Sequence, residues 1–92
     1  MSNAFEWDHA KSLANLAKHG IDFKTALKLW ADPQLLEVPA RNTDEPRWFV
    51  VGRLNAKYWS AVFTRRNGVI RLISVRRSRA QEIEIYENAT ES

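Results

Sequence analysis

Residues 47–77 read RWFVVGRLNAKYWSAVFTRRNGVIRLISVRR. The stretch holds three runs rich in β-branched and aromatic residues, over 47–54, 58–65 and 69–75. Such runs favour strands, and the Asn67-Gly68 pair between the last two runs favours a two-residue hairpin turn. The stretch therefore predicts three consecutive antiparallel strands.

The turn also determines which side chains share a face of the sheet. A two-residue turn pairs Phe63 with Leu72, and the register that follows places Arg65 and Arg76 on one face. At ~3.3 Å per residue, these two arginines would lie about 20 Å apart, too far to bind one phosphate. A three-residue turn with a bulge would exchange the faces.

Two amphipathic helices are predicted before these strands. Asp8 is a good N-cap for a helix over residues 9–18 that Gly20 ends, and Asp22 caps a second helix that stops at Asp32-Pro33. We expect the apolar stripe of the first helix to face the core. The stripe consists of Ala10, Leu13, Ala14, Leu16 and Ala17.

Shorter signals complete the prediction of the fold. Residues 5–7 form a brief strand, residues 35–38 form a strand that Pro39 confines to an edge, and residues 42–46 form a polar turn. Ser78, with Gln81 three residues later, is expected to cap a final helix. The fold class is α+β, an antiparallel β-sheet of three to four strands with two N-terminal helices and one C-terminal helix.

Length and composition indicate one domain over residues 1–92, because a chain of this size holds a single core. Residues 1–4 are similar to a tag remnant or a disordered N-terminus, and residues 87–92 are expected to be a tail. The sequence has no cysteine, no leader-like segment and no apolar run long enough to span a membrane. These features predict a cytoplasmic protein without a membrane partner.

The charges are distributed unevenly along the chain. Between Arg47 and Arg79 there are nine Lys or Arg residues and no Asp or Glu. Such a run attracts polyanions, which indicates RNA, DNA or an acidic protein segment as the partner. The alternative is a solvated basic edge that only prevents sheets from pairing with one another.

Five segments in order resemble the BrnT family, the toxins of BrnT/BrnA type II toxin-antitoxin systems. They are Phe5-Glu6-Trp7-Asp8, Lys18-His19-Gly20-Ile21-Asp22-Phe23, Asp32-Pro33, residues 47–53 and residues 70–77. The resemblance as a whole extends over residues 5–86. The final helix departs from the family pattern, since it reads Ala80-Gln81-Glu82-Ile83-Glu84 where further basic residues are usual.

The resemblance implies a RelE-like fold and an endoribonuclease that inhibits translation. It also implies a BrnA-like DNA-binding antitoxin as partner, in an assembly such as a heterotetramer. No cofactor is implied, and two histidines without carboxylates at ligand spacing do not predict a metal site.

Cleaving RNA without a metal requires proton transfer and stabilisation of the charge on the phosphorane. For the second task we predict Arg76, Arg77 and Arg65, which lie at strand ends. Because neighbouring strand residues point to opposite faces, only one of Arg76 and Arg77 can line a given groove. Alternatively, one of them pairs with Glu82 or Glu84 of the final helix.

His19 is the candidate for acid-base catalysis, because its ordinary pKa lies near neutrality. The alternative is that it interacts with the C-terminal end of the first helix. Trp7 and Lys11 are candidates for stacking on a base and binding a phosphate, although Trp7 also suits the core. Arg71 and Arg53 of the basic run complete the predicted substrate-binding residues.

Two rival functions use the same residues. One is a non-catalytic nucleic-acid-binding module, in which the arginines bind phosphates and no group transfers protons. The other is a protein whose basic sheet docks an acidic segment of an antitoxin.

Overall fold

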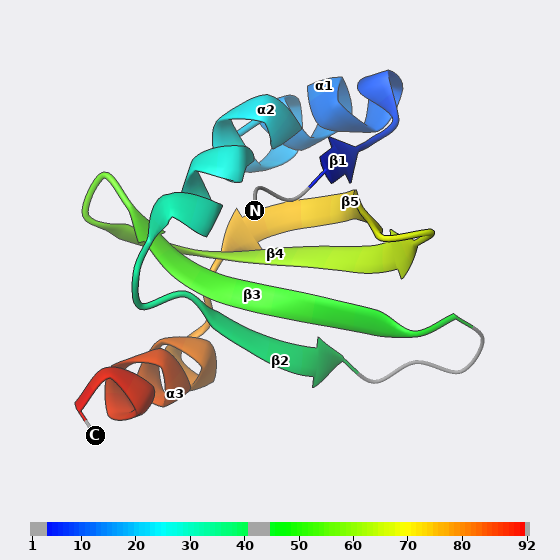
Figure 1. The fold of residues 1–92 in the computed structure, drawn as a ribbon. Helices are drawn as coiled ribbons and strands as arrows, with labels where there is room; N and C mark the ends of the chain where they lie inside the picture. Colours follow the sequence, from blue (N-terminus) through cyan, green and yellow to red (C-terminus); the bar gives the residue numbers. More distant parts are fainter. Residues whose placement is uncertain (1–3, 41–44, 92) are drawn as a thin grey trace.

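The computed structural model of the chain describes residues 4–40 and 45–91 (Figure 1). The elements in chain order are β1 (Ala4–Glu6), α1 (His9–His19), α2 (Phe23–Ala26), the 3₁₀ helix η1 (Leu27–Ala31), β2 (Leu36–Ala40), β3 (Arg47–Leu54), β4 (Lys57–Arg66), β5 (Val69–Arg77) and α3 (Ala80–Glu91). Most of the polar turn predicted at 42–46 lies outside the described residues. Helix α3 includes residues 87–91, where the sequence suggested a tail.

The five strands form one sheet in the order β1-β5-β4-β3-β2. β2 to β5 pair antiparallel with their neighbours, whereas β1 runs parallel to β5. The α+β class is therefore confirmed, whereas the antiparallel sheet of three to four strands that was predicted is a mixed sheet of five strands. β1 overlaps the brief strand predicted over residues 5–7, but it pairs with Val69–Arg71, far along the sequence, so no local pattern predicts this parallel pairing.

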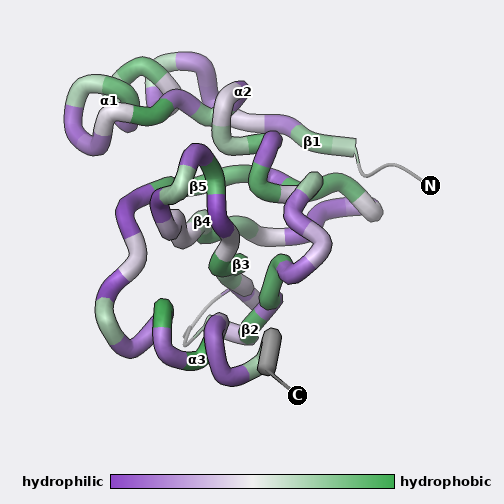
Figure 2. Tube along the Cα trace, turned by 90° about the vertical axis from the view of Figure 1, so that its left-hand side faces the viewer, coloured by the Kyte–Doolittle hydropathy of each residue, from purple (hydrophilic) through white to green (hydrophobic). Residues whose placement is uncertain are grey.

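Helices cover both faces of the sheet. The face that carries Trp59, Ala61 and Phe63, here called the core face, packs against α2 and η1. The opposite face, which carries Ser60, is called the α3 face because α3 packs there against β3. Figures 1 and 2 show α1 and α2 beside β5, with α3 at the far side of the sheet near β2.

Local sequence signals set the ends of several elements. The Asp8 carboxylate accepts the Lys11 N–H at the start of α1, and Gly20 ends that helix with a left-handed φ of 79°. Asp22 caps α2 through the Thr25 N–H. These predicted starts and stops are confirmed, although the second predicted helix is one α-helical turn followed by the 3₁₀ helix η1.

Helix α1 turns the opposite side toward the protein from the one predicted. All five residues of its apolar stripe are exposed, and Leu13 and Leu16 retain 56% and 45% of their accessible surface. The buried residues are Ser12 and Asn15 instead. The prediction that the stripe faces the core is wrong.

Hydrogen bonds explain this orientation. The Asn15 amide donates to the carbonyls of Ile21 and Val75 at 2.7 and 2.9 Å and accepts the Val75 N–H at 3.1 Å. The Ser12 hydroxyl accepts the Phe23 N–H at 2.9 Å. Leaving a buried backbone group unpaired costs about 1–3 kcal/mol, so these four bonds outweigh burial of two leucines at about 1.5–3 kcal/mol each.

A β-bulge interrupts the pairing of β4 with β5. From the turn, the ladder follows the predicted register as far as Phe63, which pairs with Leu72. Val62 then pairs with Ser74, so Ile73 is an extra residue. The extra residue exchanges the faces of every β5 side chain that follows it, including both terminal arginines.

Candidate nucleic-acid interface

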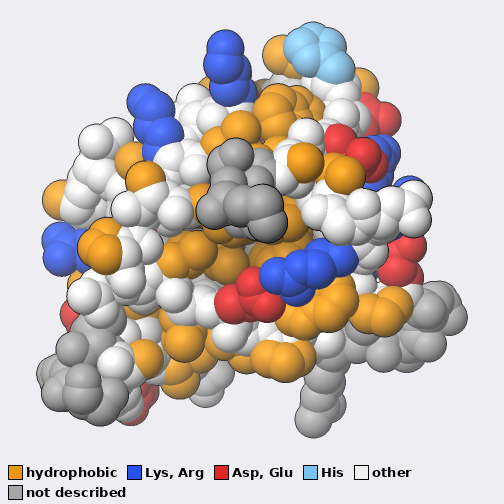
Figure 3. Space-filling view, in the orientation of Figure 1, with side chains coloured by type: hydrophobic (Ala, Val, Ile, Leu, Met, Phe, Trp, Pro, Cys, Tyr) orange, Lys and Arg blue, Asp and Glu red, His pale blue; other side chains and the backbone are white. Residues whose placement is uncertain are grey.

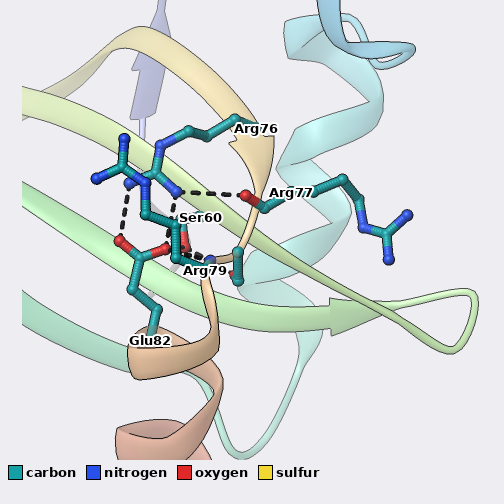
Figure 4. Close-up of polar contacts among 6 residues, drawn as sticks. Ser60, Arg76, Arg77, Arg79 and Glu82 are labelled. Atoms are coloured by element: carbon teal, nitrogen blue, oxygen red, sulfur yellow. Dashed lines mark hydrogen bonds and ion pairs between the residues drawn. The ribbon is translucent and has the colours of Figure 1, made fainter.

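Arg76 and Arg77 extend to opposite sides of β5 (Figure 4). Arg76 pairs with Ser60 in the ladder and lies on the α3 face, whereas Arg77 pairs with Trp59 and lies on the core face. Strand alternation predicted that two adjacent arginines would not line one groove, and their positions agree with that prediction. The bulge reverses the expected faces, so Arg65 shares its face with Arg77 and not with Arg76.

Arg76 forms a double hydrogen bond with Glu82 of α3. Its two terminal nitrogens donate to the two carboxylate oxygens at 2.8 Å each, and the side chains are 25% and 13% exposed. The Glu82 carboxylate also accepts the Ser60 hydroxyl and the Arg79 N–H, both at 2.9 Å (Figure 4). The alternative in which one arginine pairs with a helix carboxylate is thus realised by Arg76.

This network changes the protonation of its members. The hydrogen bonds from Arg76 lower the pKa of Glu82 to about 2, although partial burial acts in the opposite direction. The same bonds raise the pKa of Arg76. The predicted cap at Ser78 with Gln81 is wrong by one residue. α3 begins at Ala80, and the Glu82 carboxylate accepts the Arg79 N–H at its start, while the Ser78 hydroxyl shares a hydrogen bond with Ser60.

Carboxylates from outside the basic run pair with several of its arginines. Distances between nitrogen and oxygen are 2.7–2.9 Å in four ion pairs: Arg65–Glu37, Arg66–Glu45, Arg71–Glu6 and Arg76–Glu82. On the face shown in Figure 3, basic side chains are scattered and some lie directly beside acidic ones. Four of the nine bases in the run that lacks acids in the sequence are therefore paired with carboxylates in space.

Arg77 and Arg65 lie at opposite ends of the core face. The Arg77 guanidinium lies 5.6 Å from the centre of the Trp59 ring, and Arg65 lies 4.8 Å from the Trp48 ring and 5.2 Å from the Phe63 ring. The ring faces attract the guanidinium groups, and both arginines remain exposed. The structure does not bring Arg65 together with either terminal arginine.

The remaining predicted substrate-binding residues are also dispersed. Trp7 is partly buried and packs against the core, apart from Lys11, which is exposed on α1. Arg71 binds Glu6 at 2.8 Å on the α3 face. Arg53 lies over the Tyr58 ring and lines a pocket with Lys28, Asp32 and Tyr86 near α3.

Two predicted residues, Lys11 and His19, do meet in one pocket. With Ala14, Asn15, Lys18, Ile73 and Ser74 they line a hollow of about 220 Å³ between α1 and the bulge of β5. β1 pairs only with Val69–Arg71, so this part of β5 is an open edge where the Asn15 side chain takes the place of a neighbouring strand. The pocket thus combines two lysines and an imidazole at a strand edge.

Lys18 is the member of this group that the sequence analysis missed as a site residue. It lies seven residues after Lys11, which is two helical turns, and His19 lies four residues after Asn15. This spacing is visible in the sequence, but the prediction that α1 buries its apolar side placed both lysines on a solvated surface.

None of the helices in residues 4–40 and 45–91 has the length and apolar character needed to cross a membrane. Over the same residues, no three His, Asp or Glu side chains gather in an arrangement that could hold a metal ion.

Comparison with protein families supports the resemblance noted from the sequence. Residues 7–82 match the family model for BrnT, the ribonuclease toxin of type II toxin-antitoxin systems. The chain belongs to this family. A search of curated proteins finds no match. The matched BrnT region includes α1, the pocket at the β5 edge, both terminal arginines of β5 and Glu82.

Proposed function

We propose that the chain is an endoribonuclease that cleaves RNA by attack of a 2′-hydroxyl on the adjacent phosphodiester, without a metal ion, and so inhibits translation. The observation that carries the proposal is the grouping of Lys11, Lys18 and His19 around the pocket at the β5 bulge. Membership of a ribonuclease toxin family supplies the reaction class.

The residue types in the pocket suit the three tasks of the reaction. His19 can accept the proton from the 2′-hydroxyl or donate one to the leaving 5′-oxygen, because an imidazole changes its charge near neutral pH. Lys11 and Lys18 can bind the phosphate and stabilise the negative charge of the phosphorane. The products are a 2′,3′-cyclic phosphate and a free 5′-hydroxyl.

We propose that Arg76 assists this pocket. Ser74 lines the pocket, and Arg76 lies two residues further along β5 on the same face, a distance of about 7 Å along a strand. Its double hydrogen bond with Glu82 holds the guanidinium in one orientation. A guanidinium fixed in this way loses little conformational freedom on binding a neighbouring phosphate.

The other predicted residues fit a more distant role in this proposal. Arg77 is exposed at the same end of β5 on the other face, so RNA passing around the strand end would reach it. Arg65 lies at the far end of the β4–β5 hairpin and would contact a different part of a long substrate, if it is released from Glu37. In this proposal the chain cleaves RNA in the cytoplasm, and a BrnA-like DNA-binding antitoxin inhibits it within a heterotetramer.

A cleavage assay on pure protein tests the proposal. Wild-type protein incubated with unstructured RNA in EDTA should give fragments that end in a cyclic phosphate, and an all-deoxy strand of the same sequence should stay intact. His19→Gln should reduce the cleavage rate about a hundredfold with RNA affinity retained. Lys24→Ala removes an exposed lysine of α2 and serves as the matched control, with no change expected.

Two results would contradict parts of the proposal. Full cleavage by His19→Gln would remove His19 from the chemistry. RNA binding without cleavage by the wild type would favour the non-catalytic nucleic-acid-binding module, in which the same lysines bind phosphate.

A further inference from the structure

The outer side of α1 is an apolar helix surface that no other described element covers. Ala10, Leu13, Ala14 and Ala17 follow the i, i+3, i+4, i+7 spacing, and Leu16 extends the surface at one edge. In Figure 2, hydrophobic segments appear in α1, which lies at the margin of the molecule. We refer to these five residues as the α1 stripe.

The α1 stripe cannot be turned inward to join the core. Asn15 and Ser12 fix the rotation of the helix through four buried hydrogen bonds to Ile21, Val75 and Phe23. A helix that exposes leucines while it buries an amide and a hydroxyl departs from the usual pattern for a globular protein. Exposed apolar surface of this kind commonly marks an interaction site.

Charge indicates what kind of segment would cover the stripe. α1 contains Lys11 and Lys18 and has no Asp or Glu between His9 and His19. Both lysines lie along one border of the stripe, one helical turn from Ala14. Ala10, Ala14 and Ala17 lie between Leu13 and the two lysines around the helix, and their small side chains allow a second helix to approach closely.

We propose that the α1 stripe docks an amphipathic acidic helix of the antitoxin, with apolar side chains against Leu13 and Leu16 and carboxylates at Lys11 and Lys18. Ala14, Lys11 and Lys18 also line the pocket at the β5 edge, so the docked helix covers the pocket entrance and excludes RNA. The docking does not depend on the proposed function. Only the inference that docking blocks RNA cleavage rests on the proposed function.

Binding of purified antitoxin to the full-length chain, measured by titration calorimetry, tests the docking. The double variant Leu13→Ser/Leu16→Ser should bind roughly a hundredfold more weakly, because each buried leucine contributes about tenfold or more to affinity. Leu13→Met/Leu16→Met should bind like the wild type. Ile85→Ser is the matched control, since Ile85 is 40% exposed on α3 and should not affect binding.

The design separates docking from folding, from catalysis and from self-association. The serine variant should unfold at the wild-type temperature and keep the wild-type RNA cleavage rate, because the leucines are already exposed and lie outside the pocket. Unchanged antitoxin affinity in the serine variant, or an equal loss in Ile85→Ser, would overturn the proposal. A wild-type dimer that the serine variant converts to a monomer, with antitoxin affinity unchanged, would assign the stripe to a second copy of this chain.

Discussion

The guanidinium of Arg76 and the carboxylate of Glu82 are joined by two hydrogen bonds of 2.8 Å each, across the junction between β5 and α3. The pair fixes the start of α3 to the end of the sheet, because Glu82 also accepts the Arg79 N–H. The arginine that we assign to the RNA-binding edge is therefore held in place by the final helix.

The Arg76–Glu82 pair predicts how stability depends on pH. Glu82 has a folded-state pKa of about 2, below its ordinary value of 4.5. The contribution of Glu82 to the free energy of unfolding is therefore present above about pH 4.5 and is lost as the pH falls toward 2. Glu82→Gln should lower the free energy of unfolding by about 2 kcal/mol at pH 7 and flatten its decrease below pH 4.5.

Urea unfolding between pH 2 and pH 7 measures this effect. Glu84→Gln is the control, because Glu84 is exposed on the same helix, and it should follow the wild-type curve. A Glu82→Gln curve parallel to that of the wild type would argue against a role for this carboxylate in acid unfolding.

The orientation of α1 leads to an unusual order of mutational costs. Asn15→Ala removes three hydrogen bonds that satisfy Ile21 and Val75, so it should destabilise the chain by about 2–4 kcal/mol. Leu13→Ala, on the exposed side of the same helix, should change stability by no more than about 0.5 kcal/mol. Thermal and urea unfolding of both variants would show the order, and a larger loss for Leu13→Ala would contradict the observed rotation of the helix.

Tyr86 ties α3 to the end of η1. Its hydroxyl donates to Asp32 at 2.8 Å, and burial together with this bond raises the pKa of Tyr86 to about 12. Asp32 also accepts the N–H groups of Arg53 and Gln34; burial acts to raise its pKa, but the hydrogen bonds together lower it.

Tyr86→Phe should therefore reduce the free energy of unfolding by about 1–2 kcal/mol. Tyr58→Phe is a matched control, because Tyr58 donates to Glu87 in an exposed position and should cost less than about 0.5 kcal/mol. Spectrophotometric titration of Tyr86 in the Tyr58→Phe variant should give a midpoint well above 10. Equal losses in the two variants would show that the Asp32 contact adds nothing beyond a surface bond.

The pocket at the β5 edge predicts a particular salt dependence of RNA binding. Each lysine that contacts phosphate contributes about 0.7 to the slope of log affinity against log salt for single strands. Lys11→Ala/Lys18→Ala should therefore reduce the slope by about 1.4, while Lys24→Ala should leave it unchanged. Fluorescence anisotropy with labelled RNA at several salt concentrations measures the slope, and an unchanged slope in the double variant would place the RNA elsewhere.

The sequence by itself determined the local elements of this protein. Asp8, Gly20 and Asp22 mark helix ends, and Asn67-Gly68 specifies a two-residue turn, which the pairing of Arg66 with Val69 confirms. Each of these signals acts through hydrogen bonds or backbone angles within a few residues. These signals can therefore be recognised in the sequence without knowledge of the long-range contacts.

Only the tertiary structure decided how those elements face one another. The bulge at Ile73 moved Arg76 and Arg77 to the opposite faces from those expected, and the distant carboxylates Glu37 and Glu6 paired with arginines of the basic run. Helix α1 turned Asn15 inward because the open edge of β5 left the Val75 backbone without a strand partner. A backbone group that needs a partner is a property of the assembled sheet, and it outweighed the helix's own apolar pattern.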